Sequence, residues 1–149
     1  MDWDTYFIEH AKLAAKKSKD RSTQVGAIVV GPDNEIRSTG FNGFPRGVND
    51  DVEYRHERPQ KYKFTEHAER NCIFHAALTG QSLKGCILYL NFEPIPCTDC
   101  TRAIIQSGIT EIAGPDLDFP GKGWSEDMEI SKEMLEEAGI KIRRIKEEE

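Results

Sequence analysis

Residues 66–100, EHAERNCIFHAALTGQSLKGCILYLNFEPIPCTDC, hold the pattern that decides the fold class of this chain. They predict a helix over Glu66–Leu78, ended by Thr79-Gly80, because glycine is common just past the last helical residue. The apolar run Cys86–Phe92 predicts a buried strand, and a second helix is expected over Thr98–Ser107. Helices that alternate with buried strands are typical of a partly parallel sheet covered by helices.

The rest of the chain continues this alternation. Gln24–Val30 and Ile36–Phe41 are expected to pair as an antiparallel hairpin, because the turn signal Gly31-Pro32-Asp33-Asn34 separates them. Residues 42–63 show little periodicity and are expected to form a long loop. The other elements are predicted as helices over 3–17 and Ser125–Ala138, strands over Ile109–Ala113 and Ile140–Ile145, and a loop over 114–124. Since no repeat or linker divides the chain, we interpret residues 1–149 as one domain.

Composition excludes several classes of protein. The 149 residues include 20 Lys and Arg against 26 Asp and Glu, a net charge of −6. This acidic balance argues against stable binding of nucleic acid, which needs clustered basic charge. No apolar run reaches the ~20 residues of a membrane span, and the chain does not open on a signal-peptide pattern. Its 4 cysteines are too few for a disulfide scaffold, so we expect a cytoplasmic protein.

Two short motifs carry the chemistry. His67-Ala68-Glu69 opens one predicted helix, and Pro96-Cys97-Thr98-Asp99-Cys100 opens the next. Cys97 and Cys100 lie three residues apart, so one helical turn brings both sulfurs to one metal ion, with His67 as a third ligand. Three protein ligands leave one position open for water, as in a catalytic zinc site. Glu69 is not needed as a ligand, and it is placed to take a proton from that water.

Other interpretations of these motifs have to be weighed. A lone C-x-x-C pair also occurs in redox proteins and as half of a structural zinc site. A structural site needs a fourth ligand, which has to come from Cys72, His75, Cys86 or His56. On the predicted helix Cys72 and His75 lie more than a turn beyond His67. The combined pattern H-x-E…P-C-x-x-C is the signature of zinc-dependent nucleobase deaminases, and it favours a catalytic site.

Further blocks of sequence resemble the deoxycytidylate deaminases of the cytidine deaminase superfamily. The resemblance rests on five segments: Ser18-Lys19-Asp20, Gln24-Val25-Gly26-Ala27, Thr39 to Gly47, His67 to Asn71, and Ala103 to Ile109. It implies an α/β fold with three layers, α/β/α, and a central five-stranded mixed sheet. It also implies that His67, Cys97 and Cys100 bind zinc, that Glu69 shuttles protons, and that Asn42 hydrogen-bonds the nucleotide.

The reaction implied by this resemblance is the hydrolysis of dCMP to dUMP and ammonia, which feeds the synthesis of dTMP. Backbone groups near Ala68 and Pro96 are our hypothesis for what holds the pyrimidine. Relatives with a second zinc carry added Cys and His residues in an insertion. Residues 43–66 contain only His56 of these types, so we expect one zinc per subunit. The resemblance further implies a homo-oligomer, a hexamer in many relatives, with no membrane association.

The 5′-phosphate of such a substrate needs cationic or amide donors. The basic residues that we consider are Lys19, Arg21, Arg46, Lys61 and Lys63, although each also fits an ordinary solvated surface charge. Three alternative functions stay open, and one of them is another nucleotide or nucleoside deaminase of the same superfamily. A tRNA adenosine deaminase shares the zinc motif, but net charge −6 argues against it. A non-catalytic zinc-stabilised module has no use for Glu69 beside a metal ligand.

Overall fold

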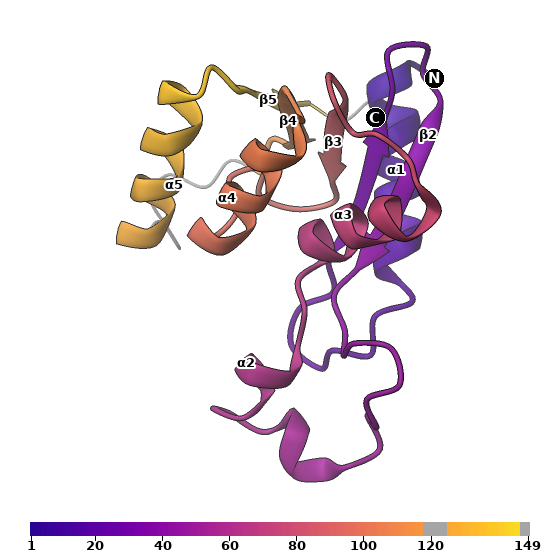
Figure 1. Cartoon of the computed structure of the whole chain (residues 1–149), viewed down its shortest axis with the longest axis vertical. Helices are drawn as coiled ribbons and strands as arrows, with labels where there is room; N and C mark the ends of the chain where they lie inside the picture. The colour runs from indigo at the N-terminus through magenta and orange to yellow at the C-terminus, as the bar shows by residue number, and fades with distance from the viewer. Residues whose placement is uncertain (118–124, 147–149) are drawn as a thin grey trace.

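The computed structural model describes residues 1–117 and 125–146, and its centre is one five-stranded sheet (Figure 1). The strand order is β2-β1-β3-β4-β5. Strands β1 and β2 are antiparallel, as are β1 and β3, whereas β3, β4 and β5 run parallel. Their bounds are β1 Gly26–Val30, β2 Ile36–Phe41, β3 Ile87–Leu90, β4 Glu111–Pro115 and β5 Lys141–Ile145. This arrangement confirms the mixed sheet and the hairpin expected from the sequence.

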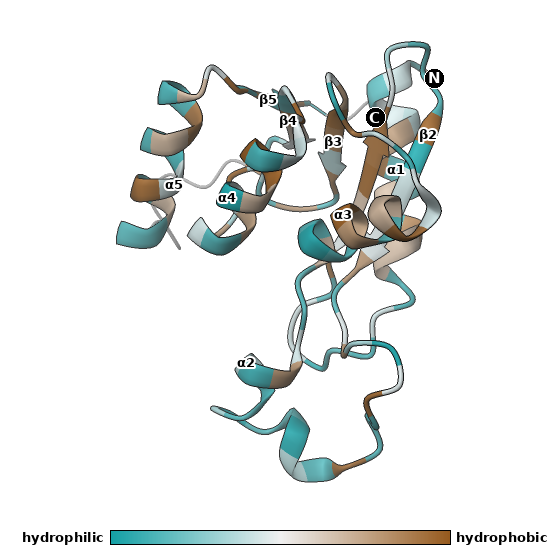
Figure 2. Cartoon of the chain, in the orientation of Figure 1, coloured by the Kyte–Doolittle hydropathy of each residue, from teal (hydrophilic) through white to brown (hydrophobic). Residues whose placement is uncertain are grey.

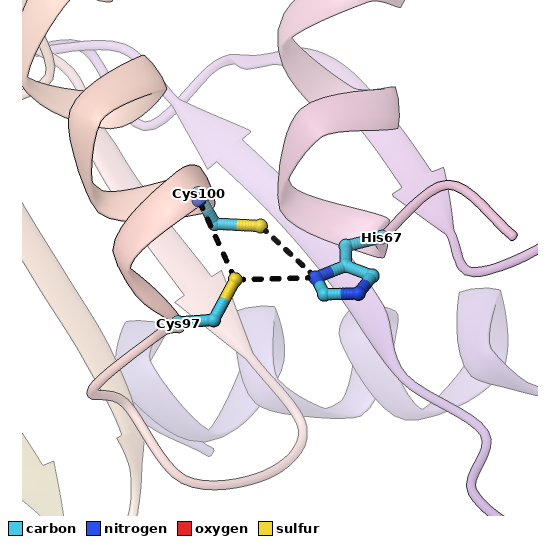
Figure 3. Close-up of side chains that lie close together, drawn as sticks. All are labelled: His67, Cys97 and Cys100. Carbon is cyan, nitrogen blue, oxygen red and sulfur yellow. Dashed lines mark hydrogen bonds between the residues drawn. The ribbon is translucent and has the colours of Figure 1, made fainter. Parts of the chain in front are cut away.

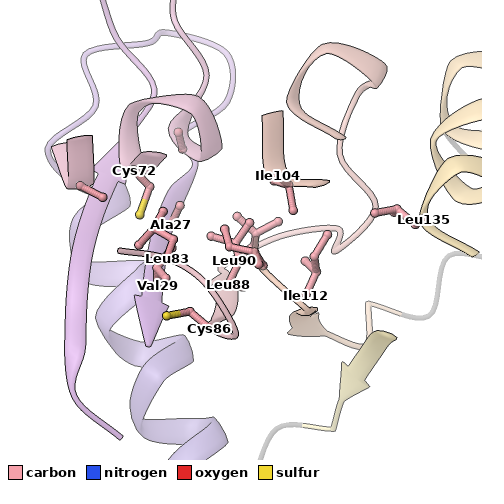
Figure 4. Close-up of a cluster of buried hydrophobic side chains, with 13 residues drawn as sticks. Ala27, Val29, Cys72, Leu83, Cys86, Leu88, Leu90, Ile104, Ile112 and Leu135 are labelled. Carbon is pink, nitrogen blue, oxygen red and sulfur yellow. The ribbon is translucent and has the colours of Figure 1, made fainter. Parts of the chain in front are cut away.

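Helices cover both faces of the sheet. The four longer helices are α1 Trp3–Ala15, α3 Ala68–Thr79, α4 Thr98–Ser107 and α5 Glu126–Glu137. Side chains of β1 alternate between the two faces, as the period of a strand requires. Ile28 and Val30 pack with Phe7, Ile8 and Ala11 of α1 in one core. The other core joins Ala27, Val29, Leu88, Leu90 and Ile112 of the sheet to Cys72, Ile104 and Leu135 of α3, α4 and α5 (Figure 4). The expected three layers, α/β/α, are therefore present.

Close packing of α3 on β2 depends on a residue without a side chain. A Cβ atom on Gly40 would lie 2.6 Å from the Ala68 carbonyl oxygen and 2.6 Å from the Cys72 nitrogen. Asn71 adds a hydrogen bond from its Nδ2 to the Phe41 carbonyl, at 2.8 Å. These contacts set the position of the first turn of α3, which carries the H-x-E motif.

Some boundaries differ from the sequence-based expectations. Residues 42–63 are not a plain loop, because they contain the 3₁₀ helix η1 Glu53–His56 and the start of the short helix α2 Lys61–Phe64. Aromatic stacking organises this segment, with the Phe44 ring 4.9 Å from His56 and 5.6 Å from Phe64 between centroids. Figure 2 shows the segment as largely hydrophilic, in contrast to the brown central strands. Because the apolar periodicity of this segment is weak, the sequence did not predict these short helices.

Helix α3 begins at Ala68 rather than Glu66. Glu66 instead pairs with Gly43 as an isolated β-bridge. The distance from the Gly43 nitrogen to the Glu66 oxygen is 3.1 Å, and that from the Glu66 nitrogen to the Gly43 oxygen is 2.8 Å. The remaining shifts are of a few residues: β3 is shorter than Cys86–Phe92, and β4 starts later than Ile109. Part of the loop expected over 114–124 lies outside the described residues. No helix in the described part of the chain is long and apolar enough to span a membrane.

Candidate active site

Two helix N-termini bring the three predicted metal ligands together. His67 is the N-cap residue of α3 and Cys97 is the N-cap residue of α4, while Cys100 lies in the first turn of α4. His67 Nδ1 is 3.3 Å from Cys100 Sγ and 3.4 Å from Cys97 Sγ (Figure 3). All three ligand atoms lie within 4.8 Å of one another. Because α4 follows β3, the cluster lies beyond the carboxyl end of that strand.

This donor set fits zinc. A tetrahedral zinc ion with Zn–N of about 2.0 Å and Zn–S of about 2.3 Å separates its nitrogen and sulfur ligands by about 3.5 Å. The observed separations of 3.3 and 3.4 Å agree with that geometry. A hydrogen bond from the Cys100 side chain lowers the pKa of Cys97 to about 4, so Cys97 is a thiolate, the form that binds metal. Without a metal, the hydrogen bond with Cys97 raises the pKa of His67 to about 9, so the imidazole has to release a proton when a metal ion binds.

The residues considered as a fourth ligand lie elsewhere. Cys72 and Cys86 are fully buried in the core, and burial raises the pKa of Cys72 to about 12. The His75 and His56 rings contact the backbone carbonyls of Thr39 and Asp50. Within residues 1–117 and 125–146, the cluster of potential ligands is His67, Cys97 and Cys100. Three protein donors are the number found at catalytic zinc sites, whereas structural sites use four.

Glu69 lies next to this cluster in the first turn of α3. Its side chain is buried, with the residue 8% exposed, and burial raises the pKa of its carboxyl group. It lines the same cavity as His67 and Cys97. A carboxylate in this position can exchange a proton with a molecule that enters the cavity.

The cavity itself has a volume of about 500 Å³. Asn42, Ala68 and Pro96, which were expected to contact the substrate, all line it. Asn42 also supports the wall, because its Oδ1 accepts a hydrogen bond from the Val25 N–H at 2.9 Å. Its Nδ2 donates to the Thr23 carbonyl at 2.8 Å. One amide hydrogen and one oxygen lone pair of Asn42 are left for a ligand.

Of the basic residues expected to hold a phosphate, four do not line this cavity. Lys19, Arg21 and Arg46 line a neighbouring cavity of about 540 Å³. There Lys19 pairs with Asp50 at 3.0 Å, and Arg21 pairs with Glu53 at 2.7 Å. Lys63 lines a smaller depression on the outer side of His67.

Two residues of the cavity wall were missed by reasoning from the sequence. Arg58 reaches the cavity from the segment between β2 and α3, and Asp127 reaches it from α5. An arginine in an aperiodic segment and an acidic residue in the first turn of a helix are both common, so neither gave a usable signal.

Comparisons with known proteins identify the family of this chain. Residues 1–113 match the family model described as the cytidine and deoxycytidylate deaminase zinc-binding region. A protein of Aliivibrio fischeri, named an uncharacterized deaminase in the luxG 3′ region, is 39% identical over 142 residues, which cover 94% of this chain and 91% of that protein. The deoxycytidylate deaminase of Mus musculus is 33% identical over 149 residues, covering 97% of this chain and 80% of the mouse protein.

Solved structures share the fold. The crystal structure of dCMP deaminase from the cyanophage S-TIM5 superposes with a TM-score of 0.72, at 24% identity, and covers 95% of this chain and 96% of the phage chain. The matched region is a zinc-binding region and includes His67, Cys97 and Cys100, so this cluster is the candidate site for the zinc cofactor. This chain therefore belongs to the cytidine and deoxycytidylate deaminase family.

Proposed function

We propose that this protein deaminates dCMP hydrolytically, forming dUMP and ammonia. The observation that carries the proposal is the buried carboxylate of Glu69 beside the His67, Cys97 and Cys100 cluster, in a cavity of about 500 Å³. A nucleotide has room in a cavity of this size. Relatives that cover most of this chain are named deoxycytidylate deaminases, which supports dCMP as the substrate.

Each group at the site has a role in this reaction. His67, Cys97 and Cys100 would hold zinc through one nitrogen and two sulfur ligands, and the zinc would supply a site for water and lower the pKa of that water. The Glu69 carboxylate accepts a proton from the water and passes it to the amino nitrogen on C4. The oxygen of water becomes bonded to C4, the C4–N bond breaks and ammonia leaves, while the second proton of the water ends on ring nitrogen N3, which gives the uracil base of dUMP. Burial of Glu69 favours this exchange, because a raised pKa makes the carboxylate a better proton acceptor.

Other residues of the cavity position the substrate. We assign the backbone groups of Ala68 and Pro96 to the pyrimidine, since both residues line the cavity beside the metal ligands. We assign the free hydrogen-bonding capacity of Asn42 to the sugar or base. The two bonds of Asn42 to the 23–25 backbone hold it in place before any ligand arrives.

Ammonia release from a panel of substrates tests the proposal. The panel consists of dCMP, CMP, deoxycytidine, dCTP and an adenosine-containing tRNA stem-loop, each with and without a zinc chelator. We expect chelator-sensitive turnover with dCMP as the preferred substrate. Turnover of the stem-loop without turnover of any mononucleotide would contradict the proposal and indicate a tRNA adenosine deaminase instead.

We further propose a homo-oligomer, with a hexamer as the expected form, located in the cytoplasm. Phe74 and Leu78 on α3 support assembly, because their side chains are 49% and 68% exposed. Burial of such apolar surface stabilises association. Sedimentation velocity measures the assembly state, and a monomer at micromolar concentration would contradict the proposal.

A further inference from the structure

The charged side chains on the wall of the catalytic cavity differ in what they already bind. Apart from the metal cluster and Glu69, they are Asp20, Arg58, Lys61, Glu93 and Asp127. Glu93 accepts two hydrogen bonds from Arg144, at 2.6 and 3.1 Å. Asp127 accepts two hydrogen bonds from Thr98. Arg144 balances the charge of Glu93, whereas Asp127 is held by the neutral Thr98, so Asp127 makes the wall around it unfavourable for an anion.

Lys61 is a cation of the wall, but its charge is already balanced. Its Nζ lies 3.2 Å from a carboxylate oxygen of Asp20. The side chains of the two residues are only 12% and 10% exposed, so the pair is shielded from water. Separating it would leave the largely buried Asp20 carboxylate with backbone N–H donors from Ser22 and Thr23 but without its cation, which is costly. Lys61 therefore holds the α2 segment to Asp20 and is not available to a ligand.

Arg58 is bound only by neutral groups. Its Nε donates to the Tyr62 hydroxyl at 2.5 Å, and its Nη2 donates to Ser22 Oγ at 3.2 Å. The guanidinium carbon also lies 5.9 Å from the centre of the Tyr62 ring. In the described part of the chain no carboxylate forms an ion pair with Arg58. The two hydroxyls orient the guanidinium group without balancing its charge, and three of its five N–H groups are left for a ligand.

We propose that Arg58 binds the 5′-phosphate of the substrate, an inference that rests on the proposed function. Arg58 lines the same cavity as Glu69, His67 and Cys97, so one molecule in the cavity can contact both Arg58 and the catalytic groups. A guanidinium group presents paired N–H donors that match two phosphate oxygens. Because the charge of Lys61 is balanced by Asp20 and that of Arg58 is not balanced within the described residues, the cavity orients a nucleoside monophosphate with its phosphate toward Arg58.

The experiment compares dCMP with deoxycytidine, which lacks the phosphate. For the wild type, Arg58→Gln, Arg58→Lys and Lys63→Gln, we measure kcat/KM for both substrates and the affinity for dUMP and deoxyuridine by calorimetry. Zinc content and Tm are recorded for each protein. Lys63→Gln is the matched control, because Lys63 is also exposed and without an ion pair among the described residues, but lies outside the catalytic cavity.

Arg58→Gln is expected to lower the ratio of kcat/KM for dCMP to that for deoxycytidine by about 10- to 100-fold, the effect of losing hydrogen bonds to a charged group. The loss should appear mainly in KM, and dUMP affinity should fall to a similar degree. The ratio for Arg58→Lys should lie between those of the wild type and Arg58→Gln, since lysine keeps the charge but lacks the paired N–H donors. If Arg58 only holds the loop in place, Arg58→Gln would lower kcat/KM for dCMP and for deoxycytidine equally. An unchanged ratio of the two kcat/KM values would overturn the proposal.

The outcomes separate this inference from the proposed function. If dCMP is turned over and Arg58→Gln keeps the wild-type ratio and dUMP affinity, the phosphate assignment fails while the deaminase function stands. The same holds if Lys63→Gln causes the loss instead. If the wild type does not turn over dCMP but binds dUMP more tightly than Arg58→Gln does, the proposed function fails and the assignment stands. If the wild type neither turns over dCMP nor binds dUMP, both fail.

Discussion

Asp127 on α5 accepts two hydrogen bonds from Thr98, the first residue of α4. The Thr98 N–H donates to Oδ2 at 3.1 Å, and the Thr98 hydroxyl donates to Oδ1 at 2.9 Å. Thr98 directly follows the ligand Cys97, so this pair fixes the turn from which the Cys97 sulfur projects. Asp127 lies beyond residues 1–113 that match the family model, which means that the C-terminal helix supports a metal site whose ligands all lie in the matched region.

Asp127→Ala is therefore expected to weaken zinc binding without removing a ligand. Loss of a group that orients a metal ligand typically lowers affinity by about 10- to 100-fold. Competition with a chelator measures this change, and the absorption of the cobalt-substituted protein reports the sulfur ligands directly. Asp127→Asn should recover part of the affinity, because its amide oxygen can still accept one of the two bonds. Glu126→Ala, in the same helical turn, is the control, and an equal effect of both alanine variants would contradict the role of Asp127.

Glu69→Gln is expected to keep zinc and lose activity. The amide has the size of the carboxyl group but cannot accept the proton, and general acid–base catalysis contributes about 10²- to 10⁴-fold to a rate. Steady-state ammonia release measures the loss, and metal analysis shows whether zinc is retained. Turnover near the wild-type rate in a zinc-loaded variant would remove Glu69 from the proton-transfer role.

Cys97→Ala is expected to lose both zinc and stability. The variant leaves two protein donors, and binding of a structural or catalytic metal is coupled to folding. Metal analysis and the Tm with and without added zinc test this. Cys72→Ala provides the comparison, because Cys72 is a buried core residue away from the cluster. That variant should lose stability through a small cavity and still bind one zinc ion per chain.

Gly40→Ala is expected to destabilise the protein by about 1–3 kcal/mol, as overpacking in a well-packed interior does. Its added methyl group would lie 2.6 Å from backbone atoms of α3, so the helix that carries His67 has to move. Gly43→Ala is the matched control, since the nearest atom to its added Cβ is 3.8 Å away. Urea unfolding should give a lower free energy of unfolding for Gly40→Ala than for Gly43→Ala. Equal values would show that α3 accommodates the methyl group without loss of stability.

Asp4 provides a pH-dependent prediction remote from the metal. Its carboxylate accepts hydrogen bonds from Arg143, at 2.8 and 3.1 Å, and from the Tyr89 hydroxyl at 2.5 Å. The Arg143 bonds hold the pKa of Asp4 below its ordinary value of 3.8. The stabilisation is therefore fully present above that value and is lost as the pH falls through the lower pKa of the folded state.

Asp4→Asn should accordingly lower the free energy of unfolding by about 1–2 kcal/mol near pH 7. The difference from the wild type should shrink as the pH falls from 3.8 toward the lower pKa of the folded state, below which the wild-type carboxyl group is also neutral. Urea unfolding over a series of pH values measures this. Asp33→Asn, in the exposed turn after β1, is the control, and a difference from wild type that stays constant down to pH 3 would contradict the argument.

The metal cluster and the order of strands and helices could be predicted because each rests on local patterns. Zinc needs particular side chains at particular spacings, and His67, Cys97 and Cys100 satisfy this within two short motifs. Apolar runs such as Ile87–Leu90 indicate the buried strands. The family resemblance extended these motifs to Asn42, which does line the cavity.

The walls of the cavity could not be predicted in the same way. Arg58 and Asp127 come from a segment without periodicity and from the last helix, and only the folded chain brings them to the metal site. The candidates for binding the phosphate were basic residues that lie near the motifs in the sequence. Two of them, Lys19 and Arg21, instead form ion pairs in a neighbouring cavity. Spacing along the chain reports shared helix faces, whereas contacts across loops depend on tertiary structure.

The position of the metal cluster between α3 and α4 has a consequence for unfolding. His67 belongs to the helix packed on the antiparallel strands β1 and β2, whereas both cysteines belong to the helix that follows the parallel strand β3. A zinc ion there acts as a removable cross-link between the two parts of the sheet. By mass action, the free energy of unfolding then rises with the logarithm of the free zinc concentration. Zinc supply thus affects the stability of the protein as well as its activity.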